Sequence, residues 1–417
     1  MDSSRSKTKP KTLAWLLPGF LSLLVAVALV SAAPARSAQD PANKQRPRRV
    51  AGSESTPSET QKPSGTPEAG EEVSEGDVVR IDTQLVSVPA IVTNSLGRPV
   101  PGLRLDNFII YEDGQKQTIT NFGTTEAPFE VALLLDTSGS TRADVELIRQ
   151  AANAFIGALR PGDRVAIVAF KDRTSGSSTL ATVDVLARLT DDRKLLRSAI
   201  ANLGTSNGTP FYDSLVRIAD EIFRDPPRNE VRGRRAVVAL TDGVDSTSSS
   251  DYAGARAKLL RAGVACYFIE VNTEDFVEDR LLKDCQDDGK LTLSAAQLQR
   301  YRQIFVPRAS SEDYADFCQM GPFQRMQISR DLYNLARREM DDLARAAGAR
   351  NFAAATLQDA RAAFARVAAD IGTQYSLGYY PTNKARDGKF RTIKVEVRGL
   401  TGKSEVRARE GYQAPKG

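Results

Sequence analysis

The chain has 417 residues, 41% hydrophobic and 26% charged, which is ordinary globular composition and enough for two or three modest domains plus linkers. It contains no histidine, and this excludes histidine-based zinc sites and Ser-His-Asp or Cys-His catalytic groups within the chain. The net charge of +5 falls to +2 without residues 1–35, which leaves 53 basic and 51 acidic side chains, too small an excess to favour nucleic-acid binding.

Residues 1–38 have the pattern of an export signal. A basic segment ending at Lys11 precedes an apolar run of 18 residues from Leu13 to Val30, and small residues follow through Ala35. A run of that length is at the lower limit for a membrane-spanning helix. Two alternatives remain, a cleaved signal peptide or an uncleaved inner-membrane anchor. Both predict that the rest of the chain is exported, to the periplasm, the cell envelope or the extracellular space.

Two further segments precede the main domain. Residues 39–75 are rich in Pro, Ser, Thr, Gly and Glu and contain no aromatic residue, which predicts a disordered linker. Residues 76–124 alternate β-forming residues with turns at Asn94–Gly97 and Glu112–Gly114. They predict a small, sandwich-like β-module that is too small to be stable alone.

Apolar strand-like runs alternate with amphipathic helical stretches over residues 127–372, which predicts an α/β domain with a doubly wound, mostly parallel sheet of Rossmann-like type. The expected strands are Val131–Leu135, Val165–Phe170, Thr182–Leu189 at an edge, Ala236–Leu240, Ala265–Val271 and a short one near Phe352–Ala355. The expected helices follow Val145 and lie at Asp191–Asn202, Pro210–Phe223, Asp251–Arg261 and Leu357–Ile371.

The polar stretch at residues 272–334 interrupts this alternation, and we interpret it as a helical insertion in the α/β domain. After the domain, residues 373–417 contain three β-rich runs that resemble the N-terminal β-module in their antiparallel character. One hypothesis is that the two β-pieces form a single module, with the α/β domain inserted between them. The turn Gly402-Lys403-Ser404 joins two of these runs, and we interpret it as a hairpin turn and not a phosphate loop.

The three cysteines lack CxxC spacing, so a cysteine metal cluster is not expected. Cys266 lies in an apolar run and is interpreted as a buried core thiol. Cys285 and Cys318 flank a polar stretch and are candidates for a disulfide in an oxidising compartment, but sequence spacing leaves the pairing open.

The strongest chemical signal is Asp136-Thr137-Ser138-Gly139-Ser140, at the end of the first expected strand. Ligands gather at the carboxyl ends of strands in open α/β sheets, and this loop offers one carboxylate and two hydroxyls there. Thr209 lies just before an expected helix, and Asp242 follows another buried strand. All of these are hard oxygen donors, which suit Mg²⁺, Mn²⁺ or Ca²⁺. The sequence therefore predicts a divalent-metal site, most suited to Mg²⁺, at Asp136, Ser138, Ser140, Thr209 and Asp242.

This three-part pattern resembles the metal-ion-dependent adhesion site of von Willebrand factor A domains at every position. The resemblance extends from about residue 80 to 415, outside the insertion, to a bacterial von Willebrand factor A-related group common in acidobacteria. It is carried by Asp163–Phe170, Tyr375–Pro381 and the ending Arg409-Glu410-Gly411-Tyr412, together with Phe108 and Glu112–Gly114. It implies a metal that keeps one coordination position for an acidic group of a partner.

The resulting expectation is an exported, non-enzymatic adhesion module that binds a carboxylate on a protein or cell-envelope partner. An envelope protein that self-associates around a structural metal is the alternative, and a metal-dependent hydrolase ranks third because no general base is evident outside the site. A loop that holds no metal is the structural alternative for the five residues. Asp172, Asp191 and Asp192 are expected in loops, as solvated charges or helix caps.

Overall fold

The computed structural model describes residues 85–141, 145–175, 178–228, 230–231, 233–283, 293–400 and 402–416. The export signal or anchor at residues 1–38, the linker at residues 39–75 and Cys285 lie outside the described residues. Cleavage of the N-terminal segment and the pairing of Cys285 with Cys318 therefore stay predictions. Cys266 is fully buried in the core, as expected, and this burial raises the pKa of its thiol to about 12.

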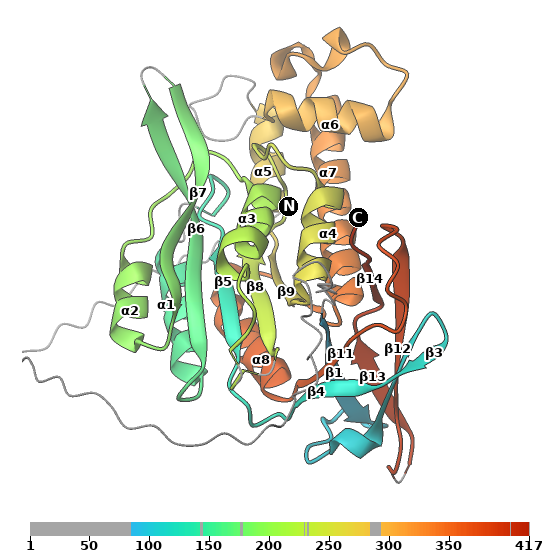
Figure 1. Ribbon diagram of the computed structural model, residues 1–417. Coiled ribbons are helices and arrows are strands. Elements are labelled where there is room, and N and C mark those ends of the chain that lie inside the picture. The colour runs from blue at the N-terminus through green and yellow to red at the C-terminus, as the bar shows by residue number, and fades with distance from the viewer. Residues whose placement is uncertain are drawn as a thin grey trace, which may run out of the picture. The chain divides into compact units, whose positions relative to one another are not determined.

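A six-stranded sheet forms the centre of the α/β domain, with the strand order β10-β9-β8-β5-β6-β7 (Figure 1). Its members are β5 (Glu130–Leu135), β6 (Arg164–Ser175), β7 (Ser178–Thr190), β8 (Arg235–Thr241), β9 (Ala265–Val271) and β10 (Asn351–Ala354). Neighbouring strands are parallel except β7, which lies antiparallel to β6 at the edge. The predicted doubly wound, mostly parallel sheet with Thr182–Leu189 at an edge is confirmed.

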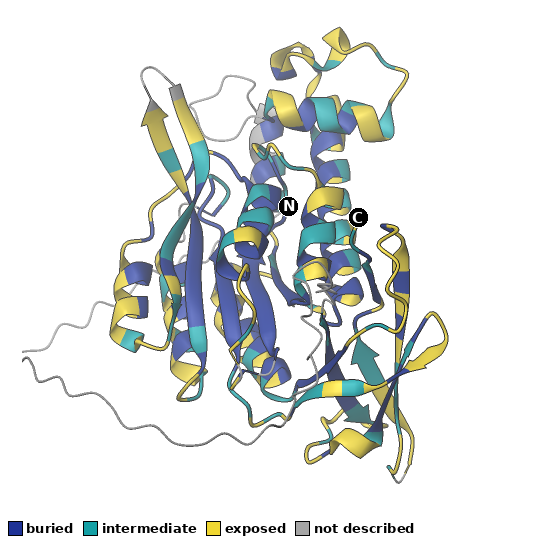
Figure 2. Cartoon of the chain, viewed as in Figure 1, coloured by how far each residue is buried: buried dark blue, intermediate teal, exposed yellow. Residues whose placement is uncertain are grey.

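Helices cover both faces of this sheet, because alternate side chains of each buried strand point to opposite layers. Leu133 packs in the layer formed with α1 and α8, while Leu134 packs in the layer formed with α3, α4 and α7. Figure 2 shows the strands between them as buried. The helices of the two layers are α1 (Val145–Ala158), α2 (Arg193–Ala201), α3 (Phe211–Arg217), which continues as the π-helical turn η3 (Ile218–Ile222), α4 (Tyr252–Ala262), α7 (Pro322–Ala346) and α8 (Ala360–Gly372), which follows the turn η6 (Leu357–Asp359).

The stretch at about residues 272–334, where an insertion was predicted, contains helices, and the last of them continues past residue 334. It contains α5 (Glu274–Lys283), α6 (Ala295–Phe305) and the short turns η4 (Glu312–Tyr314) and η5 (Phe317–Gln319). The helix α7 then runs without a break through residue 334 and into the core of the α/β domain. Its buried side chains Ile328, Leu332, Ala336, Met340 and Leu343 recur at helical spacing, so one apolar stripe serves both the insertion and the sheet.

Strands from the two ends of the described chain pair with each other in a β-module. One sheet has the order β13-β1-β11-β4, and the other has the order β14-β12-β2-β3. Both are antiparallel, and their facing side chains form one core cluster, as in a sandwich. The elements are β1 (Val86–Asn94), η1 (Leu105–Asn107), β2 (Phe108–Glu112), β3 (Gln115–Gln117), β4 (Ile119–Gly123), β11 (Tyr375–Tyr379), β12 (Phe390–Val397), β13 (Ser404–Ala408) and β14 (Gly411–Gln413).

Two turns of this module form where the local sequence predicted them. Gly97 donates to the carbonyl of Asn94, and Asp113 and Gly114 both have positive φ in the hairpin between β2 and β3, so both predicted turns are confirmed. The interpretation of residues 402–404 as a hairpin turn is wrong. β12 and β13 belong to different sheets, where they pair with β2 and β1, because each strand finds its partner far away in the sequence.

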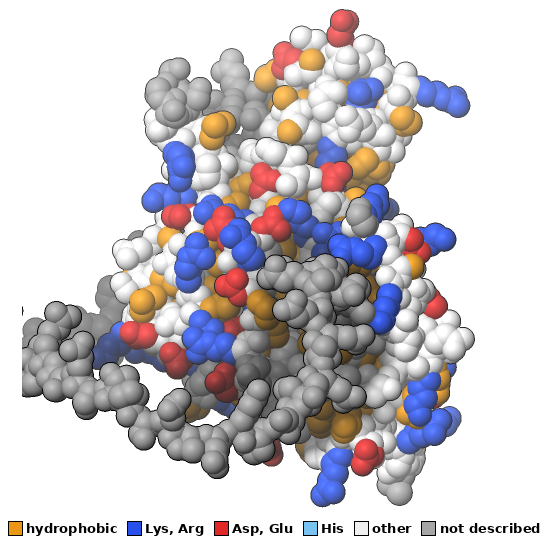
Figure 3. Space-filling view, in the orientation of Figure 1, with side chains coloured by type: hydrophobic (Ala, Val, Ile, Leu, Met, Phe, Trp, Pro, Cys, Tyr) orange, Lys and Arg blue, Asp and Glu red, His pale blue; other side chains and the backbone are white. Residues whose placement is uncertain are grey.

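Arg409 ties the β-module to the α/β domain. Its guanidinium is buried and donates to the carbonyl oxygens of Ser87, Gly411 and Leu260, the last of which belongs to α4. Elsewhere on the surface, basic and acidic side chains are interspersed over α3 and α4 (Figure 3), for example in the ion pair of Arg256 with Asp342. Among the residues that the structure describes, no helix has the length and apolar character needed to cross a membrane.

Candidate functional site

Asp136 and Asp242 lie side by side because each follows the carboxyl end of one of two paired parallel strands. Leu135, the last residue of β5, is opposite Leu240 of β8, and the backbone N–H of Asp136 donates to the carbonyl of Leu240 at 3.0 Å. The strand pairing therefore brings together two carboxylates that are 106 positions apart in the chain.

Asp136 is fully buried, and its hydrogen-bond donors among the described residues are neutral. The backbone N–H of Ser138 donates to Oδ1 at 3.0 Å, and the Thr241 hydroxyl donates to Oδ2 at 2.6 Å. Burial, followed by the negative charge of Asp242, raises the pKa of Asp136 to about 7, although these hydrogen bonds favour the ionised form. Thr241 precedes Asp242 in the sequence, and its contact with Asp136 depends on the pairing of β5 with β8.

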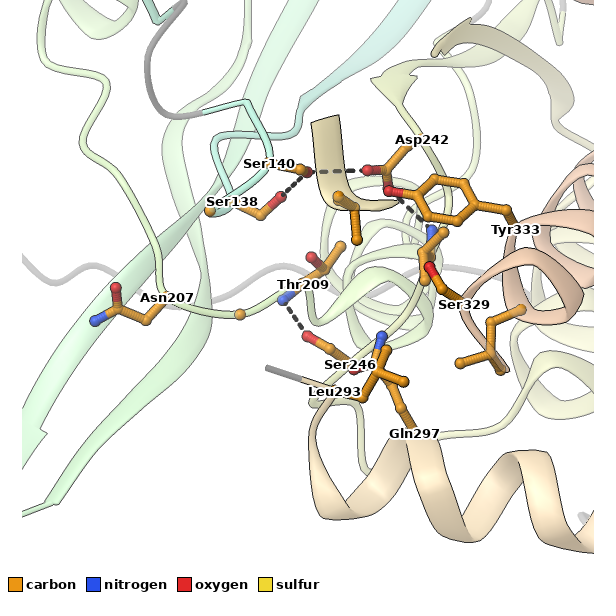
Figure 4. Close-up of a pocket in the computed structure, with 15 residues that line it drawn as sticks. Ser138, Ser140, Asn207, Thr209, Asp242, Ser246, Leu293, Gln297, Ser329 and Tyr333 are labelled. Carbon is orange, nitrogen blue, oxygen red and sulfur yellow. Dashed lines mark hydrogen bonds between the residues drawn. The ribbon is translucent and has the colours of Figure 1, made fainter. Parts of the chain in front are cut away.

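The hydroxyls of Ser138 and Ser140 lie between the two strand ends (Figure 4). Their Oγ atoms are 3.4 Å apart, and Ser140 Oγ donates to Asp242 Oδ2 at 2.9 Å. Thr141 holds this loop by donating from its hydroxyl to the carbonyls of Asp136 and Ser138. The loop after β5 thus carries its hydroxyls to the carboxylate that follows β8.

Thr209 reaches the same place from the loop before α3. Its backbone N–H donates to Ser246 Oγ at 2.8 Å, and its carbonyl accepts from the backbone N–H of Ser246 at 3.0 Å. This loop passes so close to its neighbour that a Cβ on Gly208 would lie 2.6 Å from a methyl group of Thr247. A glycine before Thr209 is therefore required for the two loops to pack.

Asp242 is held by a sharp turn. Gly243 has a φ of +75°, and a Cβ there would lie 2.7 Å from the Met340 side chain of α7, so only glycine fits. The backbone N–H of Val244 donates to Asp242 Oδ1 at 3.0 Å, which orients the carboxylate. Asp242 is only 4% exposed.

Thr273 of the insertion also holds Asp242, and Tyr333 contacts Thr273, although no pattern in the sequence indicated either residue. Thr273, just before α5, donates from its hydroxyl to Asp242 Oδ2 at 2.6 Å. The Thr273 hydroxyl is also 2.8 Å from the hydroxyl of Tyr333 in α7. Their contact joins positions 60 residues apart in the chain, which is why local patterns did not reveal it.

Of the five predicted residues, four line one pocket and Asp136 lies behind it, next to Ser138 and Thr241. The lining residues, most of them labelled in Figure 4, are Ser138, Gly139, Ser140, Asn207, Gly208, Thr209, Asp242, Val244, Ser246, Val277, Leu293, Gln297, Ser329, Leu332 and Tyr333. Asp192 caps α2 by accepting from the backbone N–H groups of Lys194 and Leu195, as expected.

The expectation that Asp172 lies in a loop is wrong. It belongs to β6, opposite Ala181 of β7, because the backbone pairing of these two strands continues past the apolar run that ends at Phe170. Its Oδ1 accepts from the Asn207 backbone N–H at 2.8 Å and from Ser206 Oγ at 3.2 Å. Asp172 therefore anchors the loop that carries Thr209.

The donor set fits a hard divalent cation. Ser138, Ser140 and Thr209, which all carry hydroxyls, line the same pocket as the Asp242 carboxylate, and the Asp136 carboxylate lies behind Ser138. Among the described residues, no Lys or Arg forms an ion pair with Asp136 or Asp242, and no group of three or more acidic or cysteine side chains forms a metal cluster. A metal here would rely on hydroxyls for most of its protein ligands.

Residues 131–244 match the family model of the von Willebrand factor type A domain. They extend from β5 to the turn after Asp242, and so include all five predicted residues. The chain contains a von Willebrand factor type A domain. Domains of this family are typically interaction modules and not enzymes, so this part of the chain is a protein-interaction or adhesion type of domain.

Solved structures with similarity to this chain share little sequence with it. A von Willebrand factor type A protein from Catenulispora acidiphila is 16% identical over 62% of this chain and 51% of its own, with a TM-score of 0.28. Proximal thread matrix protein 1 from the mussel byssus is 20% identical over 55% and 48%, with a TM-score of 0.29. The three N-terminal domains of the type V pili tip protein Mfa5 from Porphyromonas gingivalis are 17% identical over 39% and 27%, with a TM-score of 0.24.

The chain spans about half or less of the length of these solved proteins. No curated protein matches it.

Proposed function

We propose that the domain binds Mg²⁺ through Ser138, Ser140 and Thr209, with Asp136 and Asp242 balancing its charge, and uses the metal to capture a carboxylate of a protein or cell-envelope partner. The observation that carries this proposal is the convergence of three hydroxyls and two carboxylates from three separate loops. Mn²⁺ and Ca²⁺ are the alternative metals, since both prefer the same oxygen donors.

The balance of charge supports capture of an acidic group. Two carboxylates offset the charge of a divalent cation, while the hydroxyls are neutral ligands that leave the metal strongly attractive to a further oxygen. A carboxylate from a partner would then gain a charge-assisted contact with the metal. The site serves binding in this proposal, and no step of covalent chemistry is assigned to it.

The proposal also includes export of the protein from the cytoplasm. An exported protein that is cleaved from, or anchored by, its N-terminal segment would meet envelope or extracellular partners. This part rests on the sequence of residues 1–38 alone.

Calorimetric titration of Mg²⁺ into the purified chain and its Asp136→Ala variant tests the metal. We expect saturable binding by the parent and none by the variant. Asp106→Ala, which removes an exposed carboxylate from the β-module, is the matched control and should bind like the parent. Absence of binding in the parent, or equal binding by Asp136→Ala, would contradict the proposal.

A further inference from the structure

The insertion forms a second wall of the metal-site pocket. The loops after β5 and β8 and the loop before α3 make one wall, while Val277 of α5, Gln297 of α6 and Ser329 of α7 belong to the other. Figure 4 shows Ser138 and Ser140 on one side of the pocket and Ser329 and Tyr333 on the other. The hollow between the walls measures about 570 Å³ including its open mouth.

Two hydrogen bonds and one apolar contact join the two walls. Ser294 caps α6 and also donates from its hydroxyl to the carbonyl of Ser246 at 2.6 Å. Thr273 contacts Asp242, and Val244 packs against the core of the insertion. The second wall is therefore a built part of the site, and it limits what can reach the metal position.

This enclosure excludes a flat partner surface. Ser138 is 2% exposed and Asp242 is 4% exposed, so only a narrow, protruding group can reach them. Apolar side chains also line the pocket, namely Val244 of the loop after β8 and Val277, Leu293 and Leu332 of the second wall. An aliphatic group that enters with the carboxylate would be desolvated there at a gain in free energy.

Ser329 supplies an independent sign of a ligand. It is 1% exposed, it lines the pocket, and its Oγ has no hydrogen-bond partner among the described residues. A buried hydroxyl without a partner is unfavourable, and a peptide N–H or C=O at this position would satisfy it.

We infer that the partner presents an extended peptide segment in which an acidic residue has an aliphatic neighbour. The acidic side chain reaches the metal position, the aliphatic side chain packs on Leu293, Val277 and Leu332, and the peptide backbone pairs with Ser329. This inference rests on the proposed function, because the acidic residue would bind to the protein through the metal.

The test is an array of short peptides that each carry one Asp, with the residues on either side varied among Gly, Ser, Lys, Leu, Ile and Val. The probe is the full chain loaded with Mg²⁺. We expect an aliphatic neighbour to raise binding roughly ten-fold over Gly, which corresponds to partial burial of one such side chain. Peptides with Asn in place of Asp should not bind.

Substitutions at two positions of the second wall locate the preference. Leu293→Asp places a negative charge beside the aliphatic position and should abolish the preference, and Leu293→Ala should reduce it if the first variant folds poorly. Ser329→Ala should weaken all acidic peptides by about five-fold, the effect of one hydrogen bond. Leu96→Asp changes a leucine that is 74% exposed in the β-module, and it should bind like the parent.

Calorimetry with Mg²⁺ on every variant separates the possible failures. If the parent binds no Mg²⁺, the proposed function fails and this inference fails with it. If Mg²⁺ binds but aliphatic and Gly neighbours give equal signals, or Leu293→Asp keeps the preference, only the inference is overturned. The same holds if glutarate competes as strongly as the best peptide, because the ligand is then a free carboxylate.

Discussion

The buried carboxylates at the two ends of strand β5 have opposite electrostatic surroundings. Before the apolar run, Glu130 accepts from Arg164 at 2.7 Å and from Arg235 at 2.9 Å, so two guanidinium groups surround a carboxylate that is 1% exposed. After the run, Asp136 is equally buried, but its described donors are a backbone N–H and a hydroxyl, and Asp242 adds a second negative charge.

This difference distinguishes a structural site from a binding site. At the amino end the protein supplies its own cations, and the ion pairs join β5 to β6 and β8. At the carboxyl end the same three-dimensional arrangement of strands leaves two carboxylates without a cation among the described residues. Two facing carboxylates reduce stability, and under the proposed function a bound cation would restore it.

Glu130→Ala should have the largest effect on stability. It leaves the buried guanidinium of Arg235 without its carboxylate, which typically costs about 3–5 kcal/mol of unfolding free energy. Urea unfolding followed by circular dichroism measures the change. Glu312→Ala in the exposed turn η4 is the control and should leave the midpoint unchanged. A loss in Glu130→Ala no larger than in the control would show that the amino end is not a structural ion-pair site.

Asp242→Asn tests the pair of carboxylates at the carboxyl end of β5. Mg²⁺ at 100 times its dissociation constant should stabilise the parent by about 2.7 kcal/mol, and the variant should gain nothing because half of the compensating charge is lost. In EDTA the variant should be no less stable than the parent, since one of two facing carboxylates has become neutral. Thermal unfolding with and without Mg²⁺ gives both values, and a variant that is still stabilised by Mg²⁺ would remove the contrast between the two ends.

The carboxyl end of β5 and its polar residues could be predicted from the sequence, whereas the ion pairs of Glu130 were not. The continuous apolar runs before Asp136 and Asp242 indicated two buried parallel strands, and parallel strands in a doubly wound sheet bring their carboxyl ends to one edge. Their donor types then indicated a hard cation. The choice of Asp136, Ser138, Ser140, Thr209 and Asp242 follows from these local signals, and the structure places all five together.

The second wall could not be predicted because it depends on long-range packing. The polar stretch at residues 272–334 gave no reason to place its helices over the strand ends, and the contact of Thr273 with Tyr333 depends on α5 packing against α7. The same limit explains why the pairing of β12 and β13 was not predicted, since their partner strands lie hundreds of positions away in the sequence. Local patterns identify elements, whereas the partner of each element is a property of the folded chain.

Thr241→Val gives the smallest of the expected effects and the most specific test of the carboxyl end. The Thr241 hydroxyl donates to Asp136 and accepts from the backbone N–H of Gly243, so it orients both turns of the site without lining the pocket. Loss of such an orienting group typically lowers metal affinity by about 10–100-fold.

Thr137→Val is the matched control for this change, because Thr137 is also fully buried in the same region but donates to the carbonyl of Phe170. Calorimetric titration with Mg²⁺ should show weaker binding for Thr241→Val and parental affinity for Thr137→Val. Equal losses in both variants would mean that the loops respond to any lost buried hydroxyl. A loss confined to Thr241→Val would show that the hydrogen bond to Asp136 helps to hold the cation. That result would distinguish this end of β5 from the other end, where Arg164 and Arg235 balance the charge of Glu130.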